Sequence, residues 1–540
     1  MRKEETARQQ TRSIMGLMIL ICLSIAAGRI AVVTSPEGNT AFLSANDRSR
    51  WCTISSLVED GTYAIDRQIA ISDPVHRNRR PWGTIDKVRH TGSDGQLHYY
   101  SSKPPLLPTM IAGVYKILNL CTGMTMTAQP IYVPRILLAL VNLPLLAIFL
   151  IATARVMEQV CQSRAGRITG TAVTCFATMM LPFTVSLNNH LVAAASTALA
   201  MAIYLFIADR IAGAQRGDRL GVGWWWYGAI GMASAFAAAN ELPALSMTAL
   251  WMVLCCLLNW RSVTPFIGGV AVVAIGFFGT NWMAHQSLKP AYGHRGVGSL
   301  IARIDSAGDS SSNDPDSPLA TEIQSILSDK GLAPSDATFQ ITPSDEAGRF
   351  VVQADGHLFA LVNQESAWQL SHWDDWYEYP GSYWKDGRRR GVDRGEPSKA
   401  VYLFQMTLGH YGIFSLTPIW LLLPFGFAIS LRVGASEYRW MAGATLLATL
   451  VCILFYVNRP MIDRNYGGVS TCFRWVLWFA PLWLAIIAPV LDEWSESPKR
   501  RRITGALFAA SVFSMSTALA SPWQSPWLYR FWQFLGWIGA

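Results

Sequence analysis

Long runs of apolar residues, bounded by polar and charged positions, recur along most of the chain. A run of about 18 apolar residues or more is long enough to cross a membrane as a helix. Eleven spans are predicted, near residues 13–33, 131–154, 168–187, 191–208, 223–239, 243–259, 263–284, 411–431, 440–457, 474–492 and 503–520. The pattern therefore predicts an all-α polytopic membrane protein.

One further apolar run, at residues 104–120, decides the orientation of the spans. If this run crosses the membrane, the basic residues after the second and fourth spans lie outside. If it is an interfacial or re-entrant helix, they lie inside, and so do the basic residues of the later loops. The residues placed inside are then Arg155, Arg164, Arg167, Arg210, Arg216 and Arg219, and in the later loops Arg432, Arg439, Lys499, Arg500, Arg501 and Arg502. The positive-inside rule favours the second arrangement. We expect a multi-pass protein of the inner (plasma) membrane, with its N-terminus in the cytoplasm and its C-terminus outside.

The polar stretches between the spans divide the chain into three parts. A transmembrane module is expected at 1–284, with a first outer loop at 34–130, followed by an extracytoplasmic segment at 285–402 and C-terminal helices at 403–540. Within the middle part, the Ser/Asp/Gly-rich stretch 305–316 predicts a flexible loop. Alternating residues at 338–342 and 349–361 predict strands. The full expectation is a helical membrane protein with outer juxtamembrane helices and a small mixed α/β segment outside.

Composition narrows the possible partners. The chain has 540 residues, of which 51% are hydrophobic and 15% charged, with a net charge of +8. In a membrane protein such an excess of basic residues reflects cytoplasmic loops, so no nucleic-acid partner is expected. Nine cysteines without a Cys-x-x-Cys spacing give no sign of a zinc site. We therefore expect membrane lipids as partners and no metal or cofactor.

The predicted orientation gathers the unusual polar residues on one side of the membrane. Asp47, Lys103, the Asn188-Asn189-His190 triplet, Glu241, His410 and the stretch 463–466 all fall on the outer side. A transporter or flippase for a lipid-linked glycan, the competing hypothesis, would place ionisable groups near the middle of the bilayer. The span interiors hold almost none. This distribution favours an enzyme that works at the outer face.

Residues 46–105 carry a resemblance to a known superfamily. Asn46-Asp47 follow the first span, Gly61 and Tyr100 come later, and Lys103-Pro104-Pro105 closes the segment. This pattern resembles the GT-C membrane glycosyltransferases, and within them the branch of aminoarabinose transferases and protein O-mannosyltransferases (glycosyltransferase family 39-like). The resemblance extends over roughly residues 10–210. It implies a GT-C-like fold, a polyprenyl-phosphate-linked sugar as donor, and inverting transfer to an acceptor hydroxyl on a lipid, glycan or protein.

Such chemistry needs a carboxylate that takes the proton of the acceptor, and cations that stabilise the leaving phosphate. Asp47 is the candidate general base. Lys103, Arg474 and Arg464 are the candidates for binding the donor phosphate. The candidates for other substrate contacts are Arg50, Asn189, His190, Glu241, His410 and Tyr466.

Two departures from the family pattern keep another hypothesis open. Asn46 stands where relatives have an acid, and Ser102 where some have a glutamate. A non-catalytic GT-C-like binding protein is therefore an alternative. Asp47 also has an alternative structural role, because aspartate is favoured at helix N-termini.

Overall fold

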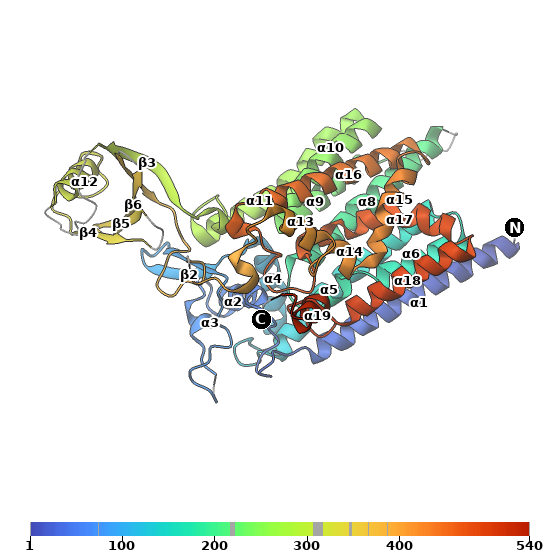
Figure 1. Ribbon diagram of the computed structural model, residues 1–540, viewed down its shortest axis with the longest axis horizontal. Coiled ribbons are helices and arrows are strands. Elements are labelled where there is room, and N and C mark those ends of the chain that lie inside the picture. The colour runs from blue at the N-terminus through green and yellow to red at the C-terminus, as the bar shows by residue number, and fades with distance from the viewer. Residues whose placement is uncertain are drawn as a thin grey trace.

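The computed structural model has a long bundle of helices with a small β-sheet at one end (Figure 1). It describes residues 2–73, 75–215, 222–305, 317–344, 348–364, 367–385 and 387–538. Arg216, Arg219 and nearly all of the predicted loop 305–316 lie outside the described residues.

The helices follow the apolar runs of the sequence. The first part of the chain contains α1 (Arg2–Val32), α2 (Ala45–Glu59), α3 (Asp66–Ala70), α4 (Leu106–Thr122), α5 (Tyr132–Val160), α6 (Arg164–Phe176), α7 (Met180–Phe183), α8 (Asn189–Gln215), α9 (Trp225–Asn240), α10 (Leu245–Leu258) and α11 (Val263–His285). The later part contains α12 (Pro318–Asp329), α13 (Lys399–Thr407), α14 (Ile413–Leu416), α15 (Leu423–Ser430), α16 (Ser436–Val457), α17 (Ala480–Trp494), α18 (Pro498–Ser516) and α19 (Trp527–Phe534). Short 3₁₀ turns join them at η1 (Leu242–Ala244), η2 (Trp260–Ser262), η3 (Ala291–Gly293), η4 (Gly391–Arg394), η5 (Pro418–Leu422), η6 (Met461–Asp463) and η7 (Arg474–Phe479).

Each of the eleven apolar runs contains helix, but the runs differ in length and continuity. Within the described residues, six stretches are long and apolar enough to cross a membrane: Glu5–Val32, Tyr132–Val160, Asn189–Gly213, Trp260–His285, Ser436–Val457 and Arg474–Trp494. The other five predicted spans are shorter, interrupted or less apolar. In the run 411–431, for example, Pro418 lies at the junction of α14 and η5, as expected where a helix cannot continue. The number of eleven spans stays a prediction.

The predicted strands belong to a five-stranded antiparallel sheet of order β3-β7-β6-β5-β4. The stretch 349–361 is not one strand, however, because a turn at Asp355-Gly356 divides it into two antiparallel strands. Its members are β3 (Val297–Ile304), β4 (Phe339–Pro343), β5 (Arg349–Ala354), β6 (His357–Gln364) and β7 (Ala367–Trp373). Side chains from the strands and α12, among them Val352, Leu370 and Ile323, form a separate hydrophobic core. The sheet therefore has a core of its own, beyond the end of the helical bundle.

A smaller hairpin lies within the first loop. Strands β1 (Lys87–Thr91) and β2 (Leu97–Ser101) pair antiparallel, and α2, α4 and α5 pack around a second apolar core near them. The segment after the sheet contacts this hairpin, because the backbone N–H of Arg89 donates to the carbonyl of Trp376 at 2.8 Å. The first loop and the residues after the sheet therefore meet at the same end of the bundle.

Several helix ends meet at the opposite end. Arg12 of α1 pairs with Glu158 near the end of α5 at 3.0 Å. The carboxylate of Asp492, in α17, accepts hydrogen bonds from the backbone N–H groups of Gln162 and Ser163, both at 2.8 Å. The N-terminus lies at this end, far from the sheet (Figure 1). The basic loops that the sequence analysis assigns to the cytoplasm begin here, at α6 and α18.

Helices α9 and α11 cross very closely, which requires glycine. A Cβ added to Gly269 would lie 2.0 Å from the carbonyl oxygen of Gly228, and one on Gly231 would lie 2.1 Å from that of Phe266. Small residues allow helix backbones to approach in this way. The crossing shapes one wall of the groove described below.

Candidate functional site

Asp47 lies at the start of α2, where its side chain caps the helix. One carboxylate oxygen accepts from the backbone N–H of Leu43 at 2.9 Å, and the other from that of Ser44 at 2.8 Å. The Ser44 hydroxyl in turn accepts from the backbone N–H of Asp47, which completes a capping box. Asp47 is fully buried. Burial raises the pKa of this carboxyl, and the bonds from Leu43 and Ser44 oppose that rise.

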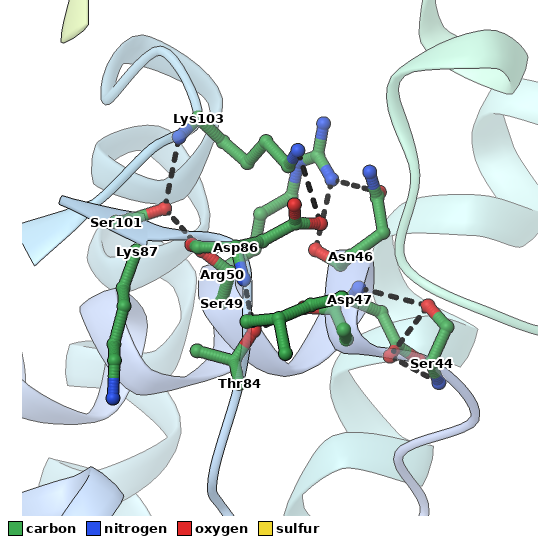
Figure 2. A network of polar contacts seen from close by, with 12 residues as sticks. Ser44, Asn46, Asp47, Ser49, Arg50, Thr84, Asp86, Lys87, Ser101 and Lys103 are labelled. Carbon is green, nitrogen blue, oxygen red and sulfur yellow. Dashed lines mark hydrogen bonds and ion pairs between the residues drawn. The ribbon is translucent and has the colours of Figure 1, made fainter. Parts of the chain in front are cut away.

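Another carboxylate, that of Asp86, occupies the position beside Lys103. The ammonium of Lys103 lies 3.0 Å from Asp86 Oδ2. The Asp86 backbone is fixed by a bond from its N–H to the Thr84 hydroxyl at 3.0 Å and by one from Ser102 N–H to its carbonyl at 3.2 Å. Figure 2 shows the Asp86 carboxylate beside Lys103 and Arg50, whereas Asp47 points away toward Ser44.

Lys103 is a half-buried cation just before the start of α4. Its side chain is 21% exposed, and its backbone N–H donates to the Ser101 hydroxyl at 3.1 Å. The two prolines that follow suit a helix start, where missing N–H groups cost nothing. Burial lowers the pKa of Lys103, an effect that Asp86 opposes and that the charges of Arg50 and Arg474 reinforce. Lys103 therefore shares its electrostatic environment with Arg50 and Arg474.

Arg50 projects from α2, one turn after Asn46. Its guanidinium donates to the side-chain oxygen of Asn46 and, at 2.8 Å, to Oδ1 of Asn189. Only 4% of Arg50 is exposed, and burial lowers its pKa to about 10, so it stays charged at neutral pH. Asn46 thus holds an arginine that an acid at the same place would hold more tightly.

Three further predicted residues continue this network. Asn189 Nδ2 donates to Oε1 of Glu241 at 2.6 Å, and Nδ1 of His190 contacts the same oxygen. On its other side, His190 Nε2 lies 2.6 Å from a terminal nitrogen of Arg474. The structure therefore connects Arg50, Asn189, Glu241, His190 and Arg474 through direct contacts.

Asp393 brings a second carboxylate toward Asp86 and Arg474. It lies in η4, after the sheet, and its Oδ2 accepts from the Tyr383 hydroxyl at 2.9 Å. Burial raises the pKa of Asp393, and the charge of Asp86 acts in the same direction. The same segment lies against the first loop, where the Trp384 indole N–H donates to the carbonyl of Ile85 at 2.7 Å. The residues after the sheet thus cover the side of the site near Asp86.

His410 and Tyr466 lie in an aromatic cluster rather than in this network. The Tyr466 and Tyr411 rings stack at 4.4 Å, and His410 meets Tyr466, Tyr529 and Trp532 edge to face. Burial lowers the pKa of His410 to about 4. The structure does not bring these two predicted residues into contact with Lys103 or Arg474.

Arg464 is also buried, with 7% exposed. Within the part of the chain that the structure describes, its Nε has no hydrogen-bond partner. Its backbone carbonyl accepts from Glu396 N–H at 2.8 Å. Arg464 therefore lies outside the contacts that join the other predicted cations.

The described residues contain no group of three or more His, Cys, Asp or Glu side chains placed to hold a metal ion. The charged network itself provides hydrogen-bond donors and cations, which are groups that recognise an anion.

A large apolar groove lies between α4, α8, α9 and α11. Its volume is about 1020 Å³, and almost all of its lining is apolar. The lining extends along α9 from Trp224 and Trp225 to Phe236, and it includes Leu106, three residues after Lys103. Gly228, Gly269 and Gly276 line it without side chains that would fill it. The groove has room for an elongated apolar group.

Sequence reasoning missed Asp86 and Asp393. Both stand in polar loops without a helix or strand period, so no local pattern distinguishes them from solvated acids. The capping role of Asp47, in contrast, has a visible signal, because Ser44-x-x-Asp47 is the spacing of a capping box.

No family model matches the sequence, and no curated protein matches it. Among solved structures, it is similar to an oligosaccharyltransferase of Archaeoglobus fulgidus in its apo form, with 9% identity and a TM-score of 0.42, over 97% of this chain and 57% of that chain. The same enzyme tethered to an acceptor peptide gives 12% identity and a TM-score of 0.41, over 96% and 57%. The oligosaccharyltransferase AglB of the same organism, in complex with an inhibitory peptide and a dolichol-phosphate, gives 10% identity and a TM-score of 0.41, over 94% of this chain and 56% of that chain. The chain thus spans a little over half the length of these proteins. At such values the likeness carries no functional information, and function has to be inferred from the site.

Proposed function

We propose that this protein is a GT-C-type membrane glycosyltransferase that moves a sugar from a polyprenyl-phosphate donor to an acceptor hydroxyl at the outer face of the membrane. One observation carries the proposal: Arg50, Lys103 and Arg474 gather with the Asp86 carboxylate in one charged network, and α4, which starts directly after Lys103, lines a large apolar groove through Leu106 and Met110. A ligand that suits both parts has an anionic head and a long apolar chain.

The charges in the network favour an anionic ligand. Arg50, Lys103 and Arg474 carry three positive charges, and Asp86 and Glu241 are the carboxylates in closest contact with them. The contacts among these five residues leave an excess of positive charge, which suits a phosphate group.

The apolar groove suits the chain of the donor. Its lining includes Leu106, three residues after Lys103, so a phosphate held by Lys103 would lead its prenyl units between α4, α9 and α11. The chain leaves lipid rather than water when it enters the groove, so the gain there comes from van der Waals packing and not from the hydrophobic effect. The head is then held by charge and the chain by shape.

The proposed transfer uses Asp86 as the general base, the role that the sequence analysis gives to Asp47. The acceptor oxygen attacks the anomeric carbon and forms the new glycosidic bond, while the bond from that carbon to the phosphate oxygen breaks. The acceptor proton passes to Asp86. The leaving phosphate keeps the bonding electron pair, and Lys103, Arg50 and Arg474 stabilise its growing charge. Attack from the side opposite to the phosphate inverts the configuration.

The alternatives predict different behaviour. A lipid-linked glycan flippase would need ionisable groups along the span interiors, whereas this network is built at helix ends and loops. A non-catalytic binding protein would keep the anion site but not depend on Asp86.

Lipid analysis of cells that lack the chain tests the proposal. We expect a polyprenyl-phosphate sugar to accumulate, to be cleared by wild type, and to persist with Lys103→Ala. A Met232→Trp substitution, which fills the groove, should also slow clearance, whereas Met283→Trp on the exposed side of α11 should not. If no such lipid accumulates, or if Lys103→Ala clears it as fast as wild type, the proposed donor is wrong.

A further inference from the structure

Glu241 is a buried acid at the turn between α9 and η1, and only 5% of it is exposed. Its Oε1 contacts two different neighbours, Asn189 Nδ2 and His190 Nδ1. Burying a carboxylate is costly unless it is paired or hydrogen-bonded. The positive charges nearest to it, on Arg50 and Arg474, are reached through these two neutral side chains.

The chemistry of arginine fixes the state of His190. A guanidinium only donates hydrogen bonds, so the Nε2 atom that faces Arg474 at 2.6 Å has to be an acceptor. His190 is then neutral, with its proton on Nδ1, the ring nitrogen that contacts Glu241 Oε1. A carboxylate on one ring nitrogen holds the histidine in this tautomer, as such partners do at other sites.

The same reasoning fixes the amide of Asn189. Arg50 donates to Oδ1 at 2.8 Å, so the amide oxygen faces the arginine. The NH₂ group therefore faces the other way, where it donates to Glu241 Oε1 and to the Asn240 carbonyl at 2.9 Å. One carboxylate thus orients two neutral side chains, and each of them accepts a hydrogen bond from a different arginine.

We propose that Glu241 is a positioning residue for an anionic headgroup: through Asn189 and His190 it holds Arg50 and Arg474 in the geometry that binds a phosphate. This inference rests on the proposed function and changes the role of three residues that the sequence analysis assigns to substrate contact. The two arginines come from α2 and η7, which are far apart in the sequence. Glu241 lies between them and connects them.

Binding of geranylgeranyl phosphate to the purified full-length protein in detergent tests the inference. We expect Glu241→Ala to weaken binding by about 10- to 100-fold, the range found when the partner that orients a metal-ligating side chain is removed. Glu437→Ala is the matched control, because Glu437 is another helix-terminal acid, at the start of α16. The melting temperature is recorded for each variant, so that a loss of affinity is compared between folded proteins.

Two substitutions of His190 distinguish a role in positioning Arg474 from a merely structural role. The amide of a glutamine reaches the place of Nε2 and can accept from Arg474, whereas that of an asparagine ends near Nδ1 and reaches only Glu241. We expect His190→Gln to keep most of the affinity and His190→Asn to lose it. A merely structural histidine would not distinguish these amides in this order.

The outcomes are separable. If wild type binds and Glu241→Ala binds equally well, or if His190→Asn binds better than His190→Gln, the positioning role is refuted. If Glu241→Ala does not fold, the His190 pair decides. If wild type itself does not bind the lipid phosphate, the proposed donor site is wrong and the inference fails with it.

Discussion

Replacing Asp86 by asparagine, with Asp47→Asn as its matched partner, tests which carboxylate acts as the base. Both acids belong to the first loop and both are buried, but only Asp86 contacts Lys103. Asparagine keeps the size of the side chain and removes its ability to take a proton. The bonds that fix the Asp86 backbone, from Ser102 and to Thr84, do not involve the carboxylate and should persist.

The two substitutions should affect different properties: Asp86→Asn the rate of transfer, and Asp47→Asn the stability of the fold. Loss of a general base lowers the rate by roughly 10²- to 10⁴-fold, or about 3–5 kcal/mol in the activation free energy. Asp86→Asn also removes a negative charge beside Lys103, so the affinity for the anionic donor should be kept or increased. Asp47→Asn leaves one acceptor oxygen where the cap uses two, which should lower the free energy of unfolding by about 1 kcal/mol. Its rate per folded molecule should remain close to that of wild type.

The assay is clearance of the accumulated lipid-linked sugar after induction of each variant, divided by the amount of folded protein in the membrane. Thermal unfolding in detergent gives the stability change separately. A slow Asp47→Asn variant with normal stability would return the role of base to Asp47. An Asp86→Asn variant within tenfold of wild type would refute the assignment of Asp86.

Three further outcomes follow from the structure. Because burial lowers the pKa of Lys103, its charge is lost at lower pH than for an ordinary lysine; binding of geranylgeranyl phosphate should weaken as pH rises, and Lys103→Arg should remove that decline. Gly269→Ala should lower the free energy of unfolding by about 1–3 kcal/mol, and with it the melting temperature, because the added Cβ would meet a backbone oxygen of α9. Gly268→Ala adds its Cβ in open space and should leave the melting temperature unchanged. The raised pKa of Asp393 means that its ionised form is disfavoured in the folded state; Asp393→Asn should therefore raise the melting temperature at pH 7 and leave it unchanged near pH 3, and a loss of stability at pH 7 would contradict this sign.

The helices could be predicted from sequence because the signal is local. A long apolar run needs no knowledge of its neighbours to indicate a helix, and α1, α5, α8 and α16 all lie on such runs. Lys103 had a local signal too, in the two prolines that follow it. Asp86 had none, since its importance comes from Ser49, Lys103 and Ser102, which are close in space but lie elsewhere in the chain. The prediction that Asp47 is the base relied on its position after the first span, which equally suits a helix cap.

The predicted orientation of the bundle explains why the cations of the network could be predicted from the sequence more readily than the acids that contact them. With the predicted orientation, basic residues at the cytoplasmic end follow from the positive-inside rule and carry little functional information. A buried or half-buried cation at the other end has no such explanation and requires a partner. Lys103 has Asp86, and Arg50 and Arg474 share Glu241 through Asn189 and His190. Because these acids offset only part of the positive charge, the cations are stabilised and the network can still attract an anion. Arg464 is buried as well but lies outside the network, so a cation in the sequence does not by itself identify the site. The acids that hold the cations in place become visible only in three dimensions.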